Sequence, residues 1–211
     1  MAQPITIESV RLRQVNLPPK VVRTDAIQSF VTQETILLTL HCSDGIEATG
    51  YAYTIGTGGS SVMALLKDHL APRLIGRDPV RVEAIWKDLF FHTHATAVGA
   101  MTSLALASVD TALWDWRAQS QCLPLWQLLG GAQARVPLYT TEGGWLQLSP
   151  EVLVEQTLKA KADGFKGAKI KIGRPHVSED VARLSAVRDA VGSGFEIMTD
   201  ANQGFHRAEV V

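Results

Sequence analysis

Two lysines separated by one residue are the first candidates for chemistry in this sequence. Lys169 and Lys171 flank Ile170 in a short segment that reads as a strand. Residues i and i+2 of a strand share a face, with Cα atoms about 6.5 Å apart, so both ammonium groups are expected to point the same way. A central parallel strand is normally apolar on both faces, so placing lysines there is costly. The alternative is an edge strand with both ammonium groups in solvent.

The close spacing of these lysines predicts acid–base chemistry. At that separation two like charges repel by about 2.5 kcal/mol in an effective dielectric of about 20, enough to lower a pKa by about 2. Desolvation and a nearby metal cation act in the same direction. Together they are expected to bring a lysine pKa from about 10.4 towards about 7 to 8, where the amine can act as a general base. On this hypothesis each lysine depends on the other.

A second polar pair follows the next predicted strand. Asp200 and Asn202 lie at the carboxyl end of that strand and again share a face. Barrel enzymes build their active sites at this end of the strands, so both pairs are expected to converge on one place. The alternative for Asp200 is an N-cap or turn residue. One carboxylate is too few for Mg²⁺, which takes several oxygen ligands, so the other ligands must come from elsewhere.

The segments that must position these pairs alternate between strand and helix patterns after about residue 135. Strands are expected at 136–141, 167–172 and 195–200. Helices between them are expected to begin at the N-caps Ser149 and Ser178. Their expected buried residues are Val154, Leu158 and Ala162 in the first helix and Val181, Leu184, Val187 and Val191 in the second. This alternation predicts a parallel sheet with helices outside, as in the opening of a (β/α)₈ barrel or of a doubly wound sheet.

The first 130 residues show a different pattern. Strands are expected at Ile5–Leu17, Gln33–Cys42 and Tyr51–Tyr53, with antiparallel character and a long loop over 18–32. The expected helices follow at Ser61–Leu70, Pro79–Phe91, Ala100–Arg117 and Pro124–Leu129. The sequence therefore predicts an α+β domain over residues 1–130, followed by a βαβαβ portion of a barrel over residues 131–211.

Composition narrows the classes of protein to which the chain can belong. Its 211 residues are 46% hydrophobic and 19% charged, with a formal net charge of -1. That balance gives no electrostatic attraction to nucleic acid or to anionic membranes. Two distant cysteines, Cys42 and Cys122, form no disulfide framework. No signal peptide or membrane span is visible, so a cytoplasmic protein without nucleic-acid or membrane partners is expected.

Two other readings of the sequence rank lower. The segment 56–61 is rich in glycine and serine and could form a phosphate cradle, but its spacing matches neither common nucleotide motif. His92 and His94 could be metal ligands, but residues two apart on a helix do not face the same way. A flexible loop tip and ordinary helix-end histidines are the favoured interpretations.

The motifs resemble the mandelate racemase/muconate lactonizing group of the enolase superfamily. The segments that carry this resemblance are Lys169-Ile170-Lys171-Ile172-Gly173, Met198-Thr199-Asp200-Ala201-Asn202-Gln203, Asp110-Thr111-Ala112-Leu113-Trp114-Asp115 and Leu128-Leu129-Gly130-Gly131. The resemblance implies an α+β capping domain followed by the start of a (β/α)₈ barrel. It also implies Mg²⁺-dependent removal of the proton α to a carboxylate, through a metal-stabilised enediolate.

Roles for individual residues also follow from this resemblance. Lys171 would be the base, Lys169 would steady the substrate carboxylate, and Asp200 would be the first Mg²⁺ ligand. Asn202 would be a polar contact at the site, and Thr141 and Tyr53 would contact the substrate. The partner is then a small carboxylate such as a sugar acid, and the full-length protein is expected to be a homo-oligomer.

The sequence indicates the reaction less specifically than it indicates the family. Segments 50–54 and 141–145 look more like those of acid-sugar dehydratases than of cycloisomerases or dipeptide epimerases. Racemase, epimerase and cycloisomerase activities remain alternatives, because all begin with loss of the α-proton. The chain stops part-way through the predicted barrel, so the other metal ligands and a second acid/base group are expected beyond Val211. By itself it is expected to be inert and poorly stable, and a non-catalytic fragment is the alternative of another class.

Overall fold

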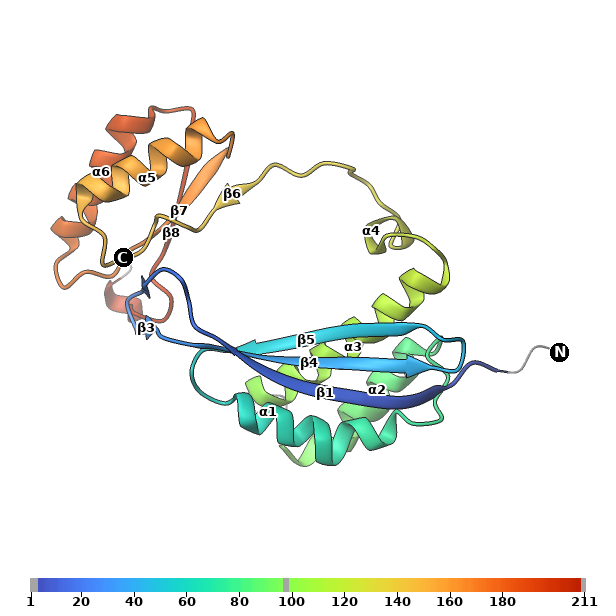
Figure 1. Cartoon of the computed structure of the whole chain (residues 1–211). Helices are drawn as coiled ribbons and strands as arrows, with labels where there is room; N and C mark the ends of the chain where they lie inside the picture. The colour runs from blue at the N-terminus through green and yellow to red at the C-terminus, as the bar shows by residue number, and fades with distance from the viewer. Residues whose placement is uncertain (1–3, 97–98, 210–211) are drawn as a thin grey trace. The chain divides into compact units, whose positions relative to one another are not determined.

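The computed structural model describes residues 4–96 and 99–209, which belong to two compact units (Figure 1). The first unit comprises residues 1–18 and 32–132, and the second comprises residues 19–31 and 133–211. The sequence placed a single boundary between residues 130 and 131. The contacts instead assign one early segment, 19–31, to the same unit as the late βαβαβ segment.

An antiparallel sheet forms the base of the first unit. Its strands are β1 (Ile7–Leu17), β4 (Gln33–Cys42) and β5 (Glu47–Thr54), with β4 in the middle. Burial alternates strictly along β5, as expected for a strand with one face on the core. The three predicted strands are therefore confirmed, although β5 begins four residues before the predicted Tyr51.

Helices follow the sheet in the first unit. They are α1 (Gly59–Leu65), the π-helical η1 (Leu66–Leu70), the 3₁₀ turn η2 (Ala71–Arg73), α2 (Val82–His92), the 3₁₀ turn η3 (His94–Thr96), α3 (Ala100–Ser120) and α4 (Leu125–Leu128). Helix α3 packs against β5, and a Cβ on Gly50 would lie 1.9 Å from the carbonyl oxygen of Ser108. Glycine at position 50 is therefore required for this close approach. Helix α2 begins later than the predicted Pro79, because the Asp78 side chain accepts the Val80 N–H and forms a turn first.

The second unit contains the predicted parallel sheet. Its order is β6 (Tyr139–Thr140), β7 (Gly167–Lys171) and β8 (Glu196–Asp200), with α5 (Pro150–Ala162) and α6 (Val177–Val191) between them. A 3₁₀ turn, η4 (Arg207–Glu209), follows β8. Strand β6 is shorter than the predicted 136–141, because only two of its residues pair with β7.

The predicted loop 18–32 contains a small hairpin. It consists of β2 (Arg23–Thr24) and β3 (Ser29–Phe30), joined by a turn in which Asp25 accepts the N–H groups of Ile27 and Gln28. The expectation of a loop without regular structure was therefore wrong at this point. The hairpin bonds to the barrel segment, since Thr24 accepts the N–H of Leu146 at 2.9 Å.

The predicted buried faces of α5 and α6 were partly wrong. In α5 the buried residues are Leu153, Thr157 and Ala160, whereas the predicted Leu158 is 42% exposed. Thr157 can be buried because its hydroxyl donates to the Leu153 carbonyl at 2.7 Å. Because threonine is treated as polar in a hydrophobic periodicity, the predicted buried face of α5 lay one position away from the observed one.

Helix α6 shows the same effect with charged residues. Asp180 and Arg183 are buried, whereas the predicted Val181 is 56% exposed. Val187 and Val191 are buried as predicted. The helix begins after His176, whose N–H is accepted by the Glu179 side chain, and not at the predicted cap Ser178. Among the residues that the structure describes, none lies in a helix with the length and apolar character that a bilayer crossing requires.

Candidate active site

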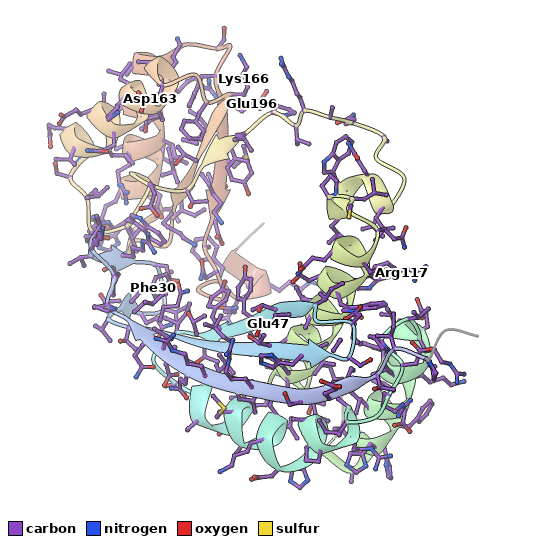
Figure 2. All side chains as sticks on the ribbon, turned by 45° about the vertical axis from the view of Figure 1, so that its right-hand side comes forward. Phe30, Glu47, Arg117, Asp163, Lys166 and Glu196 are labelled. Carbon is purple, nitrogen blue, oxygen red and sulfur yellow. The ribbon has the colours of Figure 1, made fainter. Side chains whose placement is uncertain are left out.

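Strand β7 places both lysines at one end of the parallel sheet. It is the middle strand of its sheet, so the edge-strand alternative is wrong. Ile170 is fully buried in the core with residues of α5 and α6, which leaves Lys169 and Lys171 on the opposite face. Lys166 and Glu196, labelled in Figure 2, mark the amino-terminal ends of β7 and β8, so the lysines lie towards the carboxyl ends.

Lys171 is held by two acceptors. Its Nζ donates to Asp200 Oδ2 at 2.6 Å and to Asn202 Oδ1 at 2.5 Å. The ammonium group also lies 5.6 Å from the centroid of the Trp145 ring. The side chain is only 8% exposed, so these contacts replace water around a buried charge.

Asp200 joins the two lysines. Lys169 Nζ lies 3.1 Å from the same Oδ2 atom that binds Lys171, and the Lys169 side chain is 27% exposed. The hydrogen bond from Lys171 is the main cause of a lowered Asp200 pKa, with the Asn202 backbone N–H and Lys169 acting in the same direction. Mutual repulsion between the lysines was the expected effect. The structure adds a carboxylate whose attraction opposes that repulsion.

Asn202 connects this cluster to the hairpin. Its backbone N–H donates to Asp200 Oδ1 at 2.8 Å, with a φ of 50° in the left-handed region. Its side-chain Nδ2 donates to Asp25 Oδ2 at 2.6 Å. The predicted pairs therefore converge, and a buried acidic residue from the hairpin joins them.

The segment after β6 supports β7 closely. Gly144 accepts the Lys171 N–H at 2.7 Å, and a Cβ on Gly144 would lie 2.0 Å from the Lys169 carbonyl oxygen. Glycine is therefore needed here. Next to it, Trp145 donates from Nε1 to Glu142 at 3.2 Å, and Glu142 pairs with Arg23 of β2 at 2.6 Å.

Sequence reasoning missed Asp25 and did not assign a role to Trp145. Asp25 had no motif around it, and Asn202, its partner, lies 177 residues away in sequence. The only available signal was its turn chemistry before Ile27 and Gln28.

Two other residues, Thr141 and Tyr53, were predicted to contact the substrate. Thr141 is exposed one residue past β6, and no hydrogen bond joins it to the lysines, Asp200 or Asn202 within the described ranges 4–96 and 99–209. Tyr53 lies on β5 of the first unit and is 47% exposed. Contact of either residue with a substrate stays a prediction.

The cluster fits a magnesium ion only in part. Asp200 supplies one carboxylate of the kind that Mg²⁺ prefers. In the part of the chain that the structure describes, no group of three or more His, Cys, Asp or Glu side chains could hold a metal ion. Asp200 can therefore be one ligand of a set that these residues do not complete.

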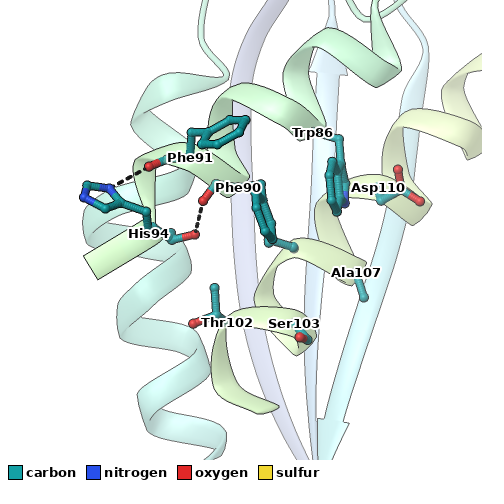
Figure 3. Close-up of a pocket in the computed structure, with 10 residues that line it drawn as sticks. Trp86, Phe90, Phe91, His94, Thr102, Ser103, Ala107 and Asp110 are labelled. Atoms are coloured by element: carbon teal, nitrogen blue, oxygen red, sulfur yellow. Dashed lines mark hydrogen bonds between the residues drawn. The ribbon is translucent and has the colours of Figure 1, made fainter. Parts of the chain in front are cut away.

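A separate aromatic cavity lies in the first unit between α2 and α3 (Figure 3). Its volume is about 490 Å³, and its walls include Trp86, Phe90 and Asp110. None of the predicted site residues lines it. His94, one of the histidines considered as a metal ligand, bonds through Nδ1 to the Phe91 carbonyl at 2.9 Å. The cavity therefore does not contain the predicted chemistry, despite its size.

Comparison with known families covers nearly the whole chain. Residues 7–130 match the family described as mandelate racemase / muconate lactonizing enzyme, N-terminal domain. Residues 152–211 match the family described as enolase C-terminal domain-like. The first match covers the α+β region, and the second begins within α5 and includes β7, α6 and β8.

Known enzymes are similar over the same span. A 3,6-anhydro-α-L-galactonate cycloisomerase of Streptomyces coelicolor is 36% identical over 198 residues, which is 93% of this chain and 54% of that protein. An L-talarate/galactarate dehydratase of Salmonella typhimurium is 33% identical over 211 residues, covering 97% of this chain and 53% of that protein. The chain thus spans about half the length of the curated relatives it matches.

The fold is shared as well as the sequence. The crystal structure of the Salmonella typhimurium dehydratase with Mg and L-lyxarohydroxamate matches 98% of this chain and 54% of its own, with a TM-score of 0.92 and 32% identity. This likeness confirms the predicted capping domain and start of a barrel. The chain belongs to the mandelate racemase/muconate lactonizing enzyme family of the enolase superfamily.

Proposed function

We propose that the protein containing this chain removes the proton α to the carboxylate of a small acid, with Lys171 as the base. The observation that carries the proposal is the convergence of Lys169, Lys171, Asp200 and Asn202 at the carboxyl ends of two adjacent parallel strands. Charged side chains gathered at this end of a barrel sheet are typical of catalytic sites.

Lys171 has the geometry of a positioned base. Its side chain is buried, and Asp200 and Asn202 both accept hydrogen bonds from Nζ. In its neutral amine form Nζ takes the α-proton, and the electron pair of the broken C–H bond moves towards the substrate carboxylate. Lys169, which is more exposed, is placed to bind a carboxylate oxygen of the substrate through its ammonium group.

Asp200 is the residue in this chain proposed to hold Mg²⁺. When bound, the ion supplies positive charge that stabilises the negative charge developing on the substrate carboxylate. Both oxygens of Asp200 are engaged in the structure, one by the Asn202 N–H and one by the two lysines. The lysine contacts hold the carboxylate in place beside the proposed base.

A sugar acid is the proposed substrate, and dehydration is the proposed reaction. Loss of the α-proton and then of the β-hydroxyl as water yields an enol that becomes a 2-keto acid. The similarity to an L-talarate/galactarate dehydratase over 97% of the chain supports this choice. The similarity to a cycloisomerase of a sugar-derived acid favours cycloisomerisation as a second candidate, which begins with the same proton abstraction.

A product screen separates these reactions. The complete natural protein is incubated with Mg²⁺ and a panel of aldonic and aldaric acids, and 2-keto acids are detected by their reaction with semicarbazide. Formation of a 2-keto product from one of these acids is expected. Turnover confined to anhydro-sugar acids would favour the cycloisomerase, and turnover confined to mandelate-like acids or muconate would contradict the proposed substrate class.

A further inference from the structure

A buried carboxylate in the hairpin has more hydrogen bonds than its turn requires. Asp25 is only 4% exposed, and its Oδ1 accepts the N–H groups of Ile27 at 2.7 Å and Gln28 at 2.9 Å. These bonds complete the turn between β2 and β3. The other oxygen, Oδ2, accepts a hydrogen bond from Asn202 Nδ2 at 2.6 Å.

This bond decides which way the Asn202 amide points. A side-chain amide has a donor end and an acceptor end, and an ionised carboxylate accepts only. With Nδ2 on Asp25, the acceptor Oδ1 faces Lys171 Nζ at 2.5 Å. The reversed amide would place oxygen against the carboxylate and two N–H donors against the ammonium group. Both contacts would then be repulsive.

The backbone on both sides of this chain of bonds is fixed. Asn202 is held in the left-handed region by the bond from its N–H to Asp200 Oδ1. The hairpin packs tightly on the same loops, because a Cβ on Gly173 or Gly204 would lie 2.6 or 2.7 Å from the Ala26 Cβ. The side-chain amide of Asn202 can therefore still turn over, and the bond to Asp25 determines its orientation.

We propose that Asp25 is a positioning residue that orients the Asn202 amide and thereby holds Lys171 Nζ in place for proton abstraction. The inference rests on the proposed function for its catalytic consequence, but the hydrogen-bond chain itself can be tested without any substrate. The early hairpin thus contributes to the active site through donor and acceptor polarity and needs no contact with the reacting atoms.

Asp25→Asn is the first test, in the complete natural protein. The substituted side chain keeps an oxygen for the turn but presents an NH₂ group to Asn202, so the Asn202 amide flips and turns its own NH₂ towards Lys171. We expect kcat to fall about 10- to 100-fold with a smaller change in KM, as for outer partners of other active-site groups. Asp78→Asn is the matched control, because Asp78 makes the same kind of turn bond, to the Val80 N–H, and belongs to the first unit.

Substitution of the other partner, Asn202, tests hydrogen-bond polarity without changing the residue that forms the turn. In Asn202→Asp two carboxylates face each other, so Tm measured at pH 8 is expected to fall by roughly 3 °C or more. Adding Asp25→Asn supplies a donor opposite the new carboxylate, whose other oxygen still accepts from Lys171. The double variant is expected to recover at least about half of the lost Tm and to turn over faster than Asn202→Asp alone.

The outcomes separate this inference from the proposed function. Asp25→Asn behaving like Asp78→Asn in both Tm and kcat, or a double variant no more stable than Asn202→Asp, would overturn the positioning role. Recovery of Tm in the double variant with Lys171→Ala still fully active would uphold the hydrogen-bond chain and overturn Lys171 as the base. Recovery of both Tm and turnover supports the positioning role and the proposed base together.

Discussion

In the part of the chain that the structure describes, the buried polar side chains of the first unit are hydroxyl groups, whereas most of those of the second unit are of charged types. Among the described residues, the buried polar side chains of the first unit are Thr39, Thr54, Thr93, Thr102 and Ser108. Those of the second unit are Asp25, Thr157, Lys171, Asp180 and Arg183. A buried hydroxyl is satisfied by one nearby carbonyl, as Ser108 is by Ala105, but a buried charge needs a surrounding network.

The two units also differ in the size of their apolar cores and in where their charged groups lie. The first unit has a large apolar core between its antiparallel sheet and helices, and its ion pairs, such as Arg77–Asp88, are at the surface. The second unit has a smaller core and places Lys171 and Asp25 in one connected set of hydrogen bonds. Costly buried charges are typical of sites whose function requires them. Mutations in the two units are therefore expected to have different signatures.

Asp200→Asn is expected to have the largest effect. The variant loses the carboxylate charge that binds both lysines, and the same carboxylate is the proposed metal ligand. Turnover should therefore fall by more than about 100-fold. Calorimetric titration with Mg²⁺ should show weaker binding, whereas Asn202→Ala should lower turnover with Mg²⁺ still bound. Unchanged Mg²⁺ affinity in Asp200→Asn would show that the ligand assignment is wrong.

A pair of glycine substitutions compares the units directly. An added methyl group meets backbone at both positions, 1.9 Å from Ser108 O for Gly50→Ala and 2.0 Å from Lys169 O for Gly144→Ala. Each variant should lose about 1–3 kcal/mol of unfolding free energy, measured by urea denaturation. Only Gly144→Ala should also lower kcat per folded molecule, since it displaces the strand that carries both lysines.

The control for this pair is Gly194→Ala, which places its methyl group in open space in the second unit. It should match the parent in stability and in kcat. Equal losses of kcat in Gly50→Ala and Gly144→Ala would remove the distinction between the two units.

A smaller effect is expected in acid. The lowered Asp200 pKa means that the folded state holds fewer protons than the unfolded state in this range. Its stabilising contribution is therefore present above the ordinary carboxyl pKa of about 4 and is lost as the pH falls below it. Denaturation curves from pH 6 to pH 3 should show a shallower decline for Asp200→Asn than for the parent. Identical curves for Asp200→Asn and the parent would contradict the linkage.

The smallest effect is expected at the surface of the first unit. Hydrogen bonds from Arg77 and Arg73 lower the Asp88 pKa, but its side chain is 37% exposed. Solvent screens such pairs, so Asp88→Asn should change the unfolding free energy by less than about 1 kcal/mol and less still in high salt. A loss comparable to that of Gly50→Ala would show that surface charges matter more in this unit than we infer.

The sequence predicted most of the strands and the core of the site for a physical reason. Strand alternation identified β1, β4 and β5, and the βαβαβ alternation identified the parallel sheet. Lys169, Lys171, Asp200 and Asn202 could be predicted together because adjacent parallel strands bring their carboxyl ends to one edge.

The features that the sequence did not predict depend on specific contacts, and hydrophobic periodicity gives no information about these. The buried faces of α5 and α6 were misplaced because Thr157, Asp180 and Arg183 are polar and yet buried, each with a hydrogen bond to a specific partner. Asp25 joins the site through a bond to Asn202 across 177 residues of sequence, and no local pattern indicates such a pairing.

The exchange of a substrate α-proton with solvent tests the central claim most directly. The complete natural protein is incubated in D₂O with Mg²⁺ and an active sugar acid, and loss of the α-proton signal is followed by ¹H NMR. Lys171→Ala should slow exchange about 10²- to 10⁴-fold, and Lys171→Arg should also fail because guanidinium stays protonated. Lys159→Ala, which removes an exposed ion pair with Asp163 in the same unit, should exchange at the parent rate. Undiminished exchange in Lys171→Ala would contradict the account.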